Sequence, residues 1–156
     1  MSSQINHVSI NALELGESVE FYVDLLGAEP IATPNFGVPV QWLALGATQL
    51  HLFERDVKPT SHHHLGITVD DLEPAFRVAE RRGALDRTSF SNHLVELPGD
   101  IVQLYVRDPA GNLVELDHHG VDRLPEDMRS QLKPLWESHE QSDEQMRGRL
   151  FVGPGD

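Results

Sequence analysis

The chain has 156 residues, a formal net charge of −13 and no cysteine. This length is enough for one domain with a buried core, and the lack of cysteine excludes disulfide scaffolds, thiolate zinc sites and cysteine nucleophiles. The acidic charge argues against binding to nucleic acid or to an anionic membrane surface, and no segment approaches the roughly 20 apolar residues of a membrane span. We therefore expect a cytoplasmic protein.

The first elements in the chain are a strand and a helix. A short alternating run begins at His7, and a helical stripe of apolar residues follows over residues 17–26. Gly27 suits the end of that helix. Three strands are then predicted, the first weaker than the others, over residues 29–33, 40–45 and 48–54.

The same order of elements returns in the second half. A strand begins at His64, Asp71 and Pro74 suit the start of a helix, and Gly83 suits its end. The step from His7 to Gly27 is 20 residues, and the step from His64 to Gly83 is 19. Three strands are again predicted, over residues 93–97, 102–107 and 113–118. The sequence therefore predicts an α+β fold made of two βαβββ modules, and not a doubly wound parallel sheet.

The last segment has a different character. Its apolar residues follow helical spacing, so we expect a helix there that Pro134 kinks or ends, packed on the domain or on a second subunit. A mobile tail is the alternative. The predicted organisation is one domain over residues 1–120, with modules at about 4–56 and 62–120, and a helical tail over 121–156.

Four side chains at related positions of the two modules are candidates for a metal site. His7 and His64 begin the first strand of each module, while His51 and Glu115 stand between apolar neighbours in each closing strand. A lone histidine in a strand is usually only hydrogen-bonded, but the repetition favours a shared role. If the two sheets face each other, these side chains can converge. Imidazole and carboxylate groups suit Zn, Ni, Mn or Fe(II).

The chain also resembles a known family, the vicinal oxygen chelate superfamily, which includes glyoxalase I, bleomycin-resistance proteins, fosfomycin-resistance enzymes and extradiol dioxygenases. The resemblance covers about residues 4–120, and its most specific segment is the last one. The segments that carry it are Asn6-His7-Val8, Phe21-Tyr22 with Leu26-Gly27, 64–72, and Asp108-Pro109-Ala110-Gly111-Asn112-Leu113-Val114-Glu115-Leu116.

This resemblance implies that the paired modules form a cupped, barrel-like mixed sheet around a divalent metal. Mapped by motif, His7, His64 and Glu115 are the ligand positions. In glyoxalase-like members the closing strand of the first module supplies a fourth ligand, usually Glu, where this chain has His51. His51 is therefore either a possible fourth ligand or a nearby acid–base group, for which its ordinary pKa near 6.5 is suited.

The extradiol dioxygenases share one further feature with the chain. Their signature places a Tyr before Asp-Pro and the ligand Glu, and Tyr105 stands ten residues before Glu115. The resemblance implies that Tyr105 orients the substrate. The signature also has a histidine closer to the Tyr than His93 is, so this chain departs from it there. The leading hypothesis is an extradiol-type, ring-cleaving dioxygenase that uses Fe(II) or Mn(II) on a catechol-like diol.

Two alternatives remain open. One is a glyoxalase-like lyase or isomerase that uses Ni(II) or Zn(II), and the other is a non-enzymatic protein that binds a small molecule, as bleomycin-resistance proteins do. A small aromatic substrate is favoured, because an apolar group of side chains could wall a pocket beside the first-module strands. We also expect a homodimer. The residues of that apolar group are Pro34, Phe36, Val38, Pro39 and Trp42.

Overall fold

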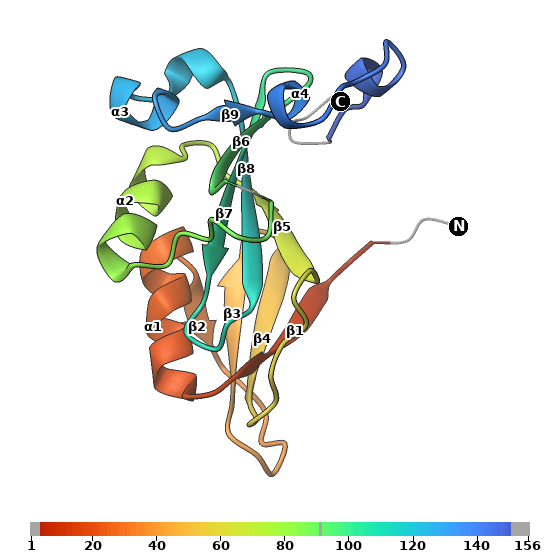
Figure 1. Ribbon diagram of the computed structural model, residues 1–156. Coiled ribbons are helices and arrows are strands. Elements are labelled where there is room, and N and C mark those ends of the chain that lie inside the picture. The colour runs from red at the N-terminus through yellow and green to blue at the C-terminus, as the bar shows by residue number, and fades with distance from the viewer. Residues whose placement is uncertain (1–3, 91, 151–156) are drawn as a thin grey trace. The chain divides into compact units, whose positions relative to one another are not determined.

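The computed structural model describes residues 4–90 and 92–150, so residues 151–156 of the predicted tail lie outside the described part (Figure 1). The chain forms two compact units. The first takes in the residues up to His63 together with Arg107–Asn112, and the second takes in His64–Val106 and the residues from Leu113 onward.

The first unit is a four-stranded mixed sheet with one helix. The strand order is β1-β4-β3-β2, with β1 parallel to β4 and the other pairs antiparallel. The helix ends at Gly27, which takes the left-handed conformation at φ 64°. The elements are β1 (His7–Ala12), α1 (Leu15–Leu26), β2 (Glu29–Ile31), β3 (Val40–Leu45) and β4 (Thr48–Glu54).

The core of this unit lies between α1 and the sheet, because α1 packs against β3 and β4. Phe21 and Tyr22 of the helix are almost fully buried, as are Leu50 and Leu52 of β4. Side chains alternate between the two faces of a strand. His51, between these two leucines, is therefore on the opposite face of the sheet from them.

The second unit repeats this plan and adds one strand. Its order is β5-β8-β7-β6-β9, with β5 parallel to β8 and β6 antiparallel to β7. The Asp71 carboxylate accepts a hydrogen bond from the backbone N–H of Glu73 at 3.1 Å, although Leu72, and not Asp71 as expected, is the N-cap residue of the helix. The repeated elements are β5 (His64–Thr68), α2 (Glu73–Arg82), β6 (Leu94–Leu97), β7 (Ile101–Arg107) and β8 (Leu113–His119).

The predicted fold class is therefore confirmed: the chain is α+β, with two mixed sheets built from βαβββ modules. Neither sheet closes into a barrel. Strands β3 and β4 have the predicted bounds residue for residue. None of the helices in the described part of the chain is long and apolar enough to cross a membrane.

The turn between β7 and β8 belongs to the first unit. The Asp108 carboxylate accepts hydrogen bonds from the Tyr22 hydroxyl at 2.9 Å and from the backbone N–H groups of Ala110 and Asn112 at 3.0 and 2.8 Å. The Asn112 amide donates to the backbone oxygen of Asn11 at 2.7 Å. This turn is the most specific segment of the family pattern, and these contacts give it a structural role.

The tail differs from the single helix that was expected. Over residues 121–150 it contains two helices of four residues each, and Pro125 and Pro134 stand directly before them, where a proline prevents the helix from extending toward its N-terminus. Its elements are a 3-10 turn (Val121–Arg123), α3 (Glu126–Arg129), β9 (Lys133–Pro134), α4 (Leu135–Ser138) and a 3-10 turn (Gln145–Arg147).

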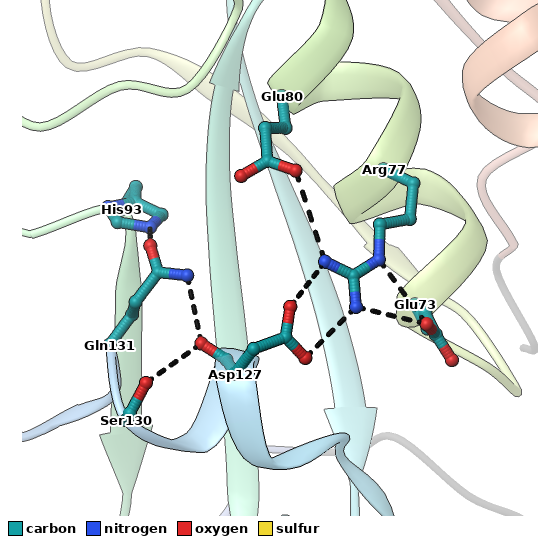
Figure 2. Close-up of polar contacts among 7 residues, drawn as sticks. All are labelled: Glu73, Arg77, Glu80, His93, Asp127, Ser130 and Gln131. Carbon is teal, nitrogen blue, oxygen red and sulfur yellow. Dashed lines mark hydrogen bonds and ion pairs between the residues drawn. The ribbon is translucent and has the colours of Figure 1, made fainter.

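Figure 2 shows how the tail is held within the second unit. The Arg77 guanidinium of α2 donates to both carboxylate oxygens of Asp127, at 2.6 and 3.0 Å, and also to Glu73. Gln131 accepts a hydrogen bond from the buried ring of His93 at 3.1 Å, and its backbone oxygen accepts one from Asn92. His93 therefore anchors the tail.

Candidate functional site

The first unit brings two of the four candidate side chains together. The rings of His7 and His51 are stacked, with their centroids 4.4 Å apart and their planes inclined by 15°. His7 is exposed at the start of β1, whereas His51 is 6% exposed. Burial, and after it the charge of His7, lower the pKa of His51.

Each of these rings has a defined hydrogen-bond partner. The side-chain oxygen of Asn6 lies 2.5 Å from Nδ1 of His7, and the side-chain oxygen of Gln49 lies 2.9 Å from Nε2 of His51. An amide oxygen only accepts, so the histidine nitrogen donates in both cases. His7 therefore has its free lone pair on Nε2, and His51 has its free lone pair on Nδ1.

The second unit brings together the other two candidates. Nε2 of His64 lies 3.4 Å from a carboxylate oxygen of Glu115, which is buried. Two atoms that each lie about 2.1 Å from one metal ion are about 3.0–3.4 Å apart at angles of 90–110°. This nitrogen and oxygen pair therefore fits two neighbouring ligands of one divalent cation.

Tyr105 lies beside this pair. Its hydroxyl donates to the side-chain oxygen of Gln103 at 2.8 Å, and the Gln103 amide donates to Asp117 at 3.1 Å. Burial, and after it the charge of Glu115, raise the pKa of Tyr105. The same two causes raise the pKa of Asp117, which is 3% exposed. Two carboxyl groups thus lie buried and close together in the second unit.

One aromatic ring packs against the side chains beside this carboxyl pair. Phe90 stacks on Tyr105 with the ring centroids 4.4 Å apart, and its edge meets His64 at 6.1 Å. Phe90 is nevertheless 42% exposed. Gly66, which pairs with Glu115, has no side chain, and a Cβ there would lie 3.6 and 3.8 Å from oxygens of Asp117 and Glu115. Phe90 thus contacts Tyr105 and His64, and the two carboxyl groups lie beside Gly66.

The predicted site residues thus lie as two pairs, His7 with His51 and His64 with Glu115, with Tyr105 beside the second pair. Over residues 4–90 and 92–150, no three histidine, aspartate or glutamate side chains form a cluster ready to hold a metal ion. The predicted ligand set of His7, His64 and Glu115 draws on both units and stays a prediction.

The apolar group predicted near the first-module strands is partly assembled. Phe36 lies 5.8 Å from Trp42 and 5.7 Å from Phe53 between ring centroids. Trp42 in turn stacks on His51 at 4.2 Å with an interplanar angle of 5°. Aromatic rings therefore continue from the loop before β3 to the candidate histidines.

A family model decides the relationship that the motifs indicated. The model described as the Glyoxalase/Bleomycin resistance protein/Dioxygenase superfamily matches residues 4–116. The chain belongs to this superfamily. The match spans both βαβββ modules and ends one residue after Glu115, so every candidate ligand lies within it.

Mitochondrial methylmalonyl-CoA epimerases are among the curated proteins similar in sequence to this chain. The mouse protein is 28% identical over 132 residues, which cover 73% of this chain and 72% of the relative. The human protein is 27% identical over 132 residues, which cover 73% of each.

Solved structures of other superfamily members share the fold. Lactoylglutathione lyase from Agrobacterium tumefaciens has a TM-score of 0.57 and 23% identity, covering 76% of this chain and 95% of that one. A variant of the fosfomycin-resistance protein FosX from Listeria monocytogenes, complexed with Mn(II) and a dihydroxypropylphosphonic acid, has a TM-score of 0.61 and 16% identity, covering 77% and 94%. At these identities the likeness concerns the fold alone.

Several residues of the site were not expected from the sequence. Asn6, Gln49, Gln103 and Asp117 contact the candidate residues, yet amides and carboxylates are common in strands and carry no signal by type. Alternation alone could have found three of them, because Gln49 lies two residues before His51, Gln103 two before Tyr105, and Asp117 two after Glu115.

Proposed function

We propose that this chain is a divalent-metal-dependent enzyme that moves a proton at a carbon atom next to a carbonyl group, as an epimerase or isomerase does. The observation that carries the proposal is the fit of His64 and Glu115 to one metal, at 3.4 Å. The named epimerases among the relatives support this reaction class.

The proposed ligands are His7, His64 and Glu115. A divalent cation bound there would supply Lewis-acid polarisation of a carbonyl oxygen. Two imidazoles and one carboxylate suit Fe(II), Mn(II), Ni(II) or Zn(II). Asn6 supports the assignment of His7, because a ligating histidine commonly donates its second ring N–H to a fixed acceptor.

The proton acceptor that we propose is His51. Its Nε2–H is held by Gln49, so its Nδ1 lone pair is available to take a proton from the substrate carbon. Phe36 and Trp42 beside it favour a substrate with an apolar or aromatic substituent. Methylmalonyl-CoA is the first substrate to test, since the relatives are named for it.

The test follows the exchange of the substrate's α-hydrogen in deuterated water by NMR, with each of the four metals in turn. We expect exchange that depends on added metal and that Glu115→Gln reduces at least about 100-fold. Glu144→Gln, at an exposed position of the tail, is the matched control and should exchange at the parent rate. No exchange with any metal would refute this function for that substrate.

A ring-cleaving dioxygenase of the extradiol type is the second candidate. The observation that favours it is Tyr105, which lies near Glu115 and whose hydroxyl donates to Gln103. This candidate requires oxygen uptake when a catechol is added to the Fe(II) or Mn(II) protein under air. The proton-transfer reaction requires none, so an oxygen electrode separates the two.

The remaining candidate is a non-enzymatic protein that binds a small molecule. It predicts binding that survives in the His7→Ala, Glu115→Ala double variant without metal, whereas both enzyme candidates predict its loss. A homodimer is part of the proposal, and light scattering of the purified chain tests it.

A further inference from the structure

His51 lies between two other rings. The indole of Trp42 is stacked on one of its faces, with centroids 4.2 Å apart, and the ring of His7 is stacked on it at 4.4 Å. Trp42 is also the residue directly opposite His51 where β3 pairs with β4. This sandwich limits how the imidazole can turn.

The stacking is incompatible with shared ligation by the two histidines. A histidine nitrogen binds a metal at about 2.0–2.1 Å, along a lone pair that lies in the ring plane. The ring centroids are 4.4 Å apart and the planes are inclined by only 15°, so the two planes do not meet within a metal–nitrogen bond length of both rings. One metal cannot lie in both ring planes, so His7 and His51 cannot hold the same ion in this arrangement.

Gln49 restrains the same ring at its edge. Its side-chain oxygen accepts the Nε2–H of His51 at 2.9 Å, so this nitrogen is occupied. Rotation of the ring to free it would break the hydrogen bond of a buried group, which costs about 1–3 kcal/mol if nothing replaces it. Trp42 of β3 and Gln49 of β4 thus hold the ring of His51 in one orientation.

Trp42 itself is held by ring packing. Its buried indole N–H has no hydrogen-bond partner among the described residues, while Phe36 packs against its ring at 5.8 Å. A phenylalanine at position 42 should therefore keep the stack on His51, and an aliphatic residue should not.

From these contacts we infer that Trp42 and Gln49 are positioning residues that keep His51 out of the metal's ligand set and present its Nδ1 as the proton acceptor. The inference rests on the proposed function for the role of that proton acceptor. The site then has three protein ligands instead of the four of glyoxalase-like members, and more of the coordination sphere is left for substrate.

The first experiment uses the full chain with Zn(II) as the probe and reads the histidine ring nitrogens by long-range ¹H–¹⁵N NMR at one fixed pH. We expect the His7 and His64 nitrogens to shift on zinc binding, while His51 keeps its Nε2–H form. A metal-type shift of either His51 nitrogen would overturn the inference.

The second experiment measures zinc affinity by competition with a chelator. We expect His51→Ala to bind zinc within about threefold of the parent, and His7→Ala to bind it more than about tenfold more weakly. Equal weakening in both variants would overturn the inference. Neither this measurement nor the NMR depends on turnover, so each stands even if the proposed reaction is not observed.

Conservative pairs of variants then test the two positioning residues. Trp42→Phe and Gln49→Glu keep the ring and the acceptor, and should retain the single His51 tautomer. Trp42→Leu and Gln49→Leu should give a mixture of tautomers, with kcat lowered about 10–100-fold and KM changed less. A single unchanged tautomer in both leucine variants would show that neither residue positions His51.

Discussion

His51 and Glu115 occupy the same place in the two repeats. His51 pairs with Ser9, two residues after His7, and Glu115 pairs with Gly66, two residues after His64. The parallel pairing of β1 with β4, and of β5 with β8, therefore sets one histidine beside one potential ligand in each unit. The repeats differ in chemistry at this place, because one presents an imidazole and the other a carboxylate.

Removal of the Asn6 side chain should weaken metal binding. Asn6 accepts the Nδ1–H of His7, so Asn6→Ala frees the ring to adopt the other tautomer and other orientations. We expect about tenfold lower zinc affinity, the smaller end of the range for residues behind a ligand. Asn6→Asp keeps an acceptor and should bind zinc nearly as well as the parent. Equal losses in both variants would contradict the assigned role.

Loss of the Asp108 carboxylate should destabilise the fold more than loss of its hydrogen-bond partner, the Tyr22 hydroxyl. Asp108→Ala leaves buried donors of Tyr22, Ala110 and Asn112 without an acceptor, and should cost at least about 2 kcal/mol of unfolding free energy. Tyr22→Phe removes one hydrogen bond and should cost about 1 kcal/mol. Urea unfolding measures both, with the exposed Asp70→Ala as the control. Equal costs for Asp108→Ala and Tyr22→Phe would contradict the argument.

The attachment of the tail should weaken in mild acid. Burial, and after it the charge of Arg87, lower the pKa of His93 below its ordinary value of 6.5, although Gln131 and Glu80 oppose this. The unfolded chain therefore takes up a proton before the folded one does. The stability from neutral His93 is complete above about pH 6.5 and is lost as the pH falls further.

Hydrogen exchange of residues 121–150 measures this effect between about pH 7.5 and 5.5. We expect faster exchange at the lower pH after correction for the intrinsic rate. In His93→Gln, which cannot take up a proton, this part of the pH dependence should disappear. The same dependence in parent and variant would assign it to other groups.

The ion pairs of Arg77 should make the tail sensitive to salt. Arg77 bonds to Asp127 of α3 and to Glu73 of its own helix, and all three side chains are accessible to water. The free-energy coupling in an Arg77→Met, Asp127→Asn double-mutant cycle should be small and should shrink further in about 0.5 M NaCl. A coupling that does not change with salt would contradict an electrostatic attachment.

The sequence predicted the fold and singled out the four side chains that lie as two pairs, because both follow from local periodicity and from the repeat, but it predicted one shared site and not these pairs. The bounds of β3 and β4 and the pairs His7–His51 and His64–Glu115 depend on strand register, which alternation largely determines. The structure of the tail could not be predicted in the same way. Its residues Leu124 and Met128 have helical spacing and are buried, yet prolines interrupt the helix that the spacing predicted.

The hydrogen bonds and ring contacts of each histidine also could not be predicted from the sequence. Whether Gln49 bonds to His51, or Asn6 to His7, depends on side-chain rotamers, and a pattern of residue types does not determine these. The stacking of Trp42 on His51 required the register of two strands that are joined by a turn. These contacts decide whether His51 acts as a metal ligand or as a proton acceptor in the proposed site.

The turn at Arg107–Asn112 means that the chain cannot be cut into its two halves without removing contacts from the first unit. A fragment that ends at His63 would contain every strand of the first sheet, yet its Tyr22 hydroxyl and Asn11 carbonyl would lack the partners that Asp108 and Asn112 provide. Expression of the two halves as independent proteins should therefore fail for the first half unless it is supplied with this loop.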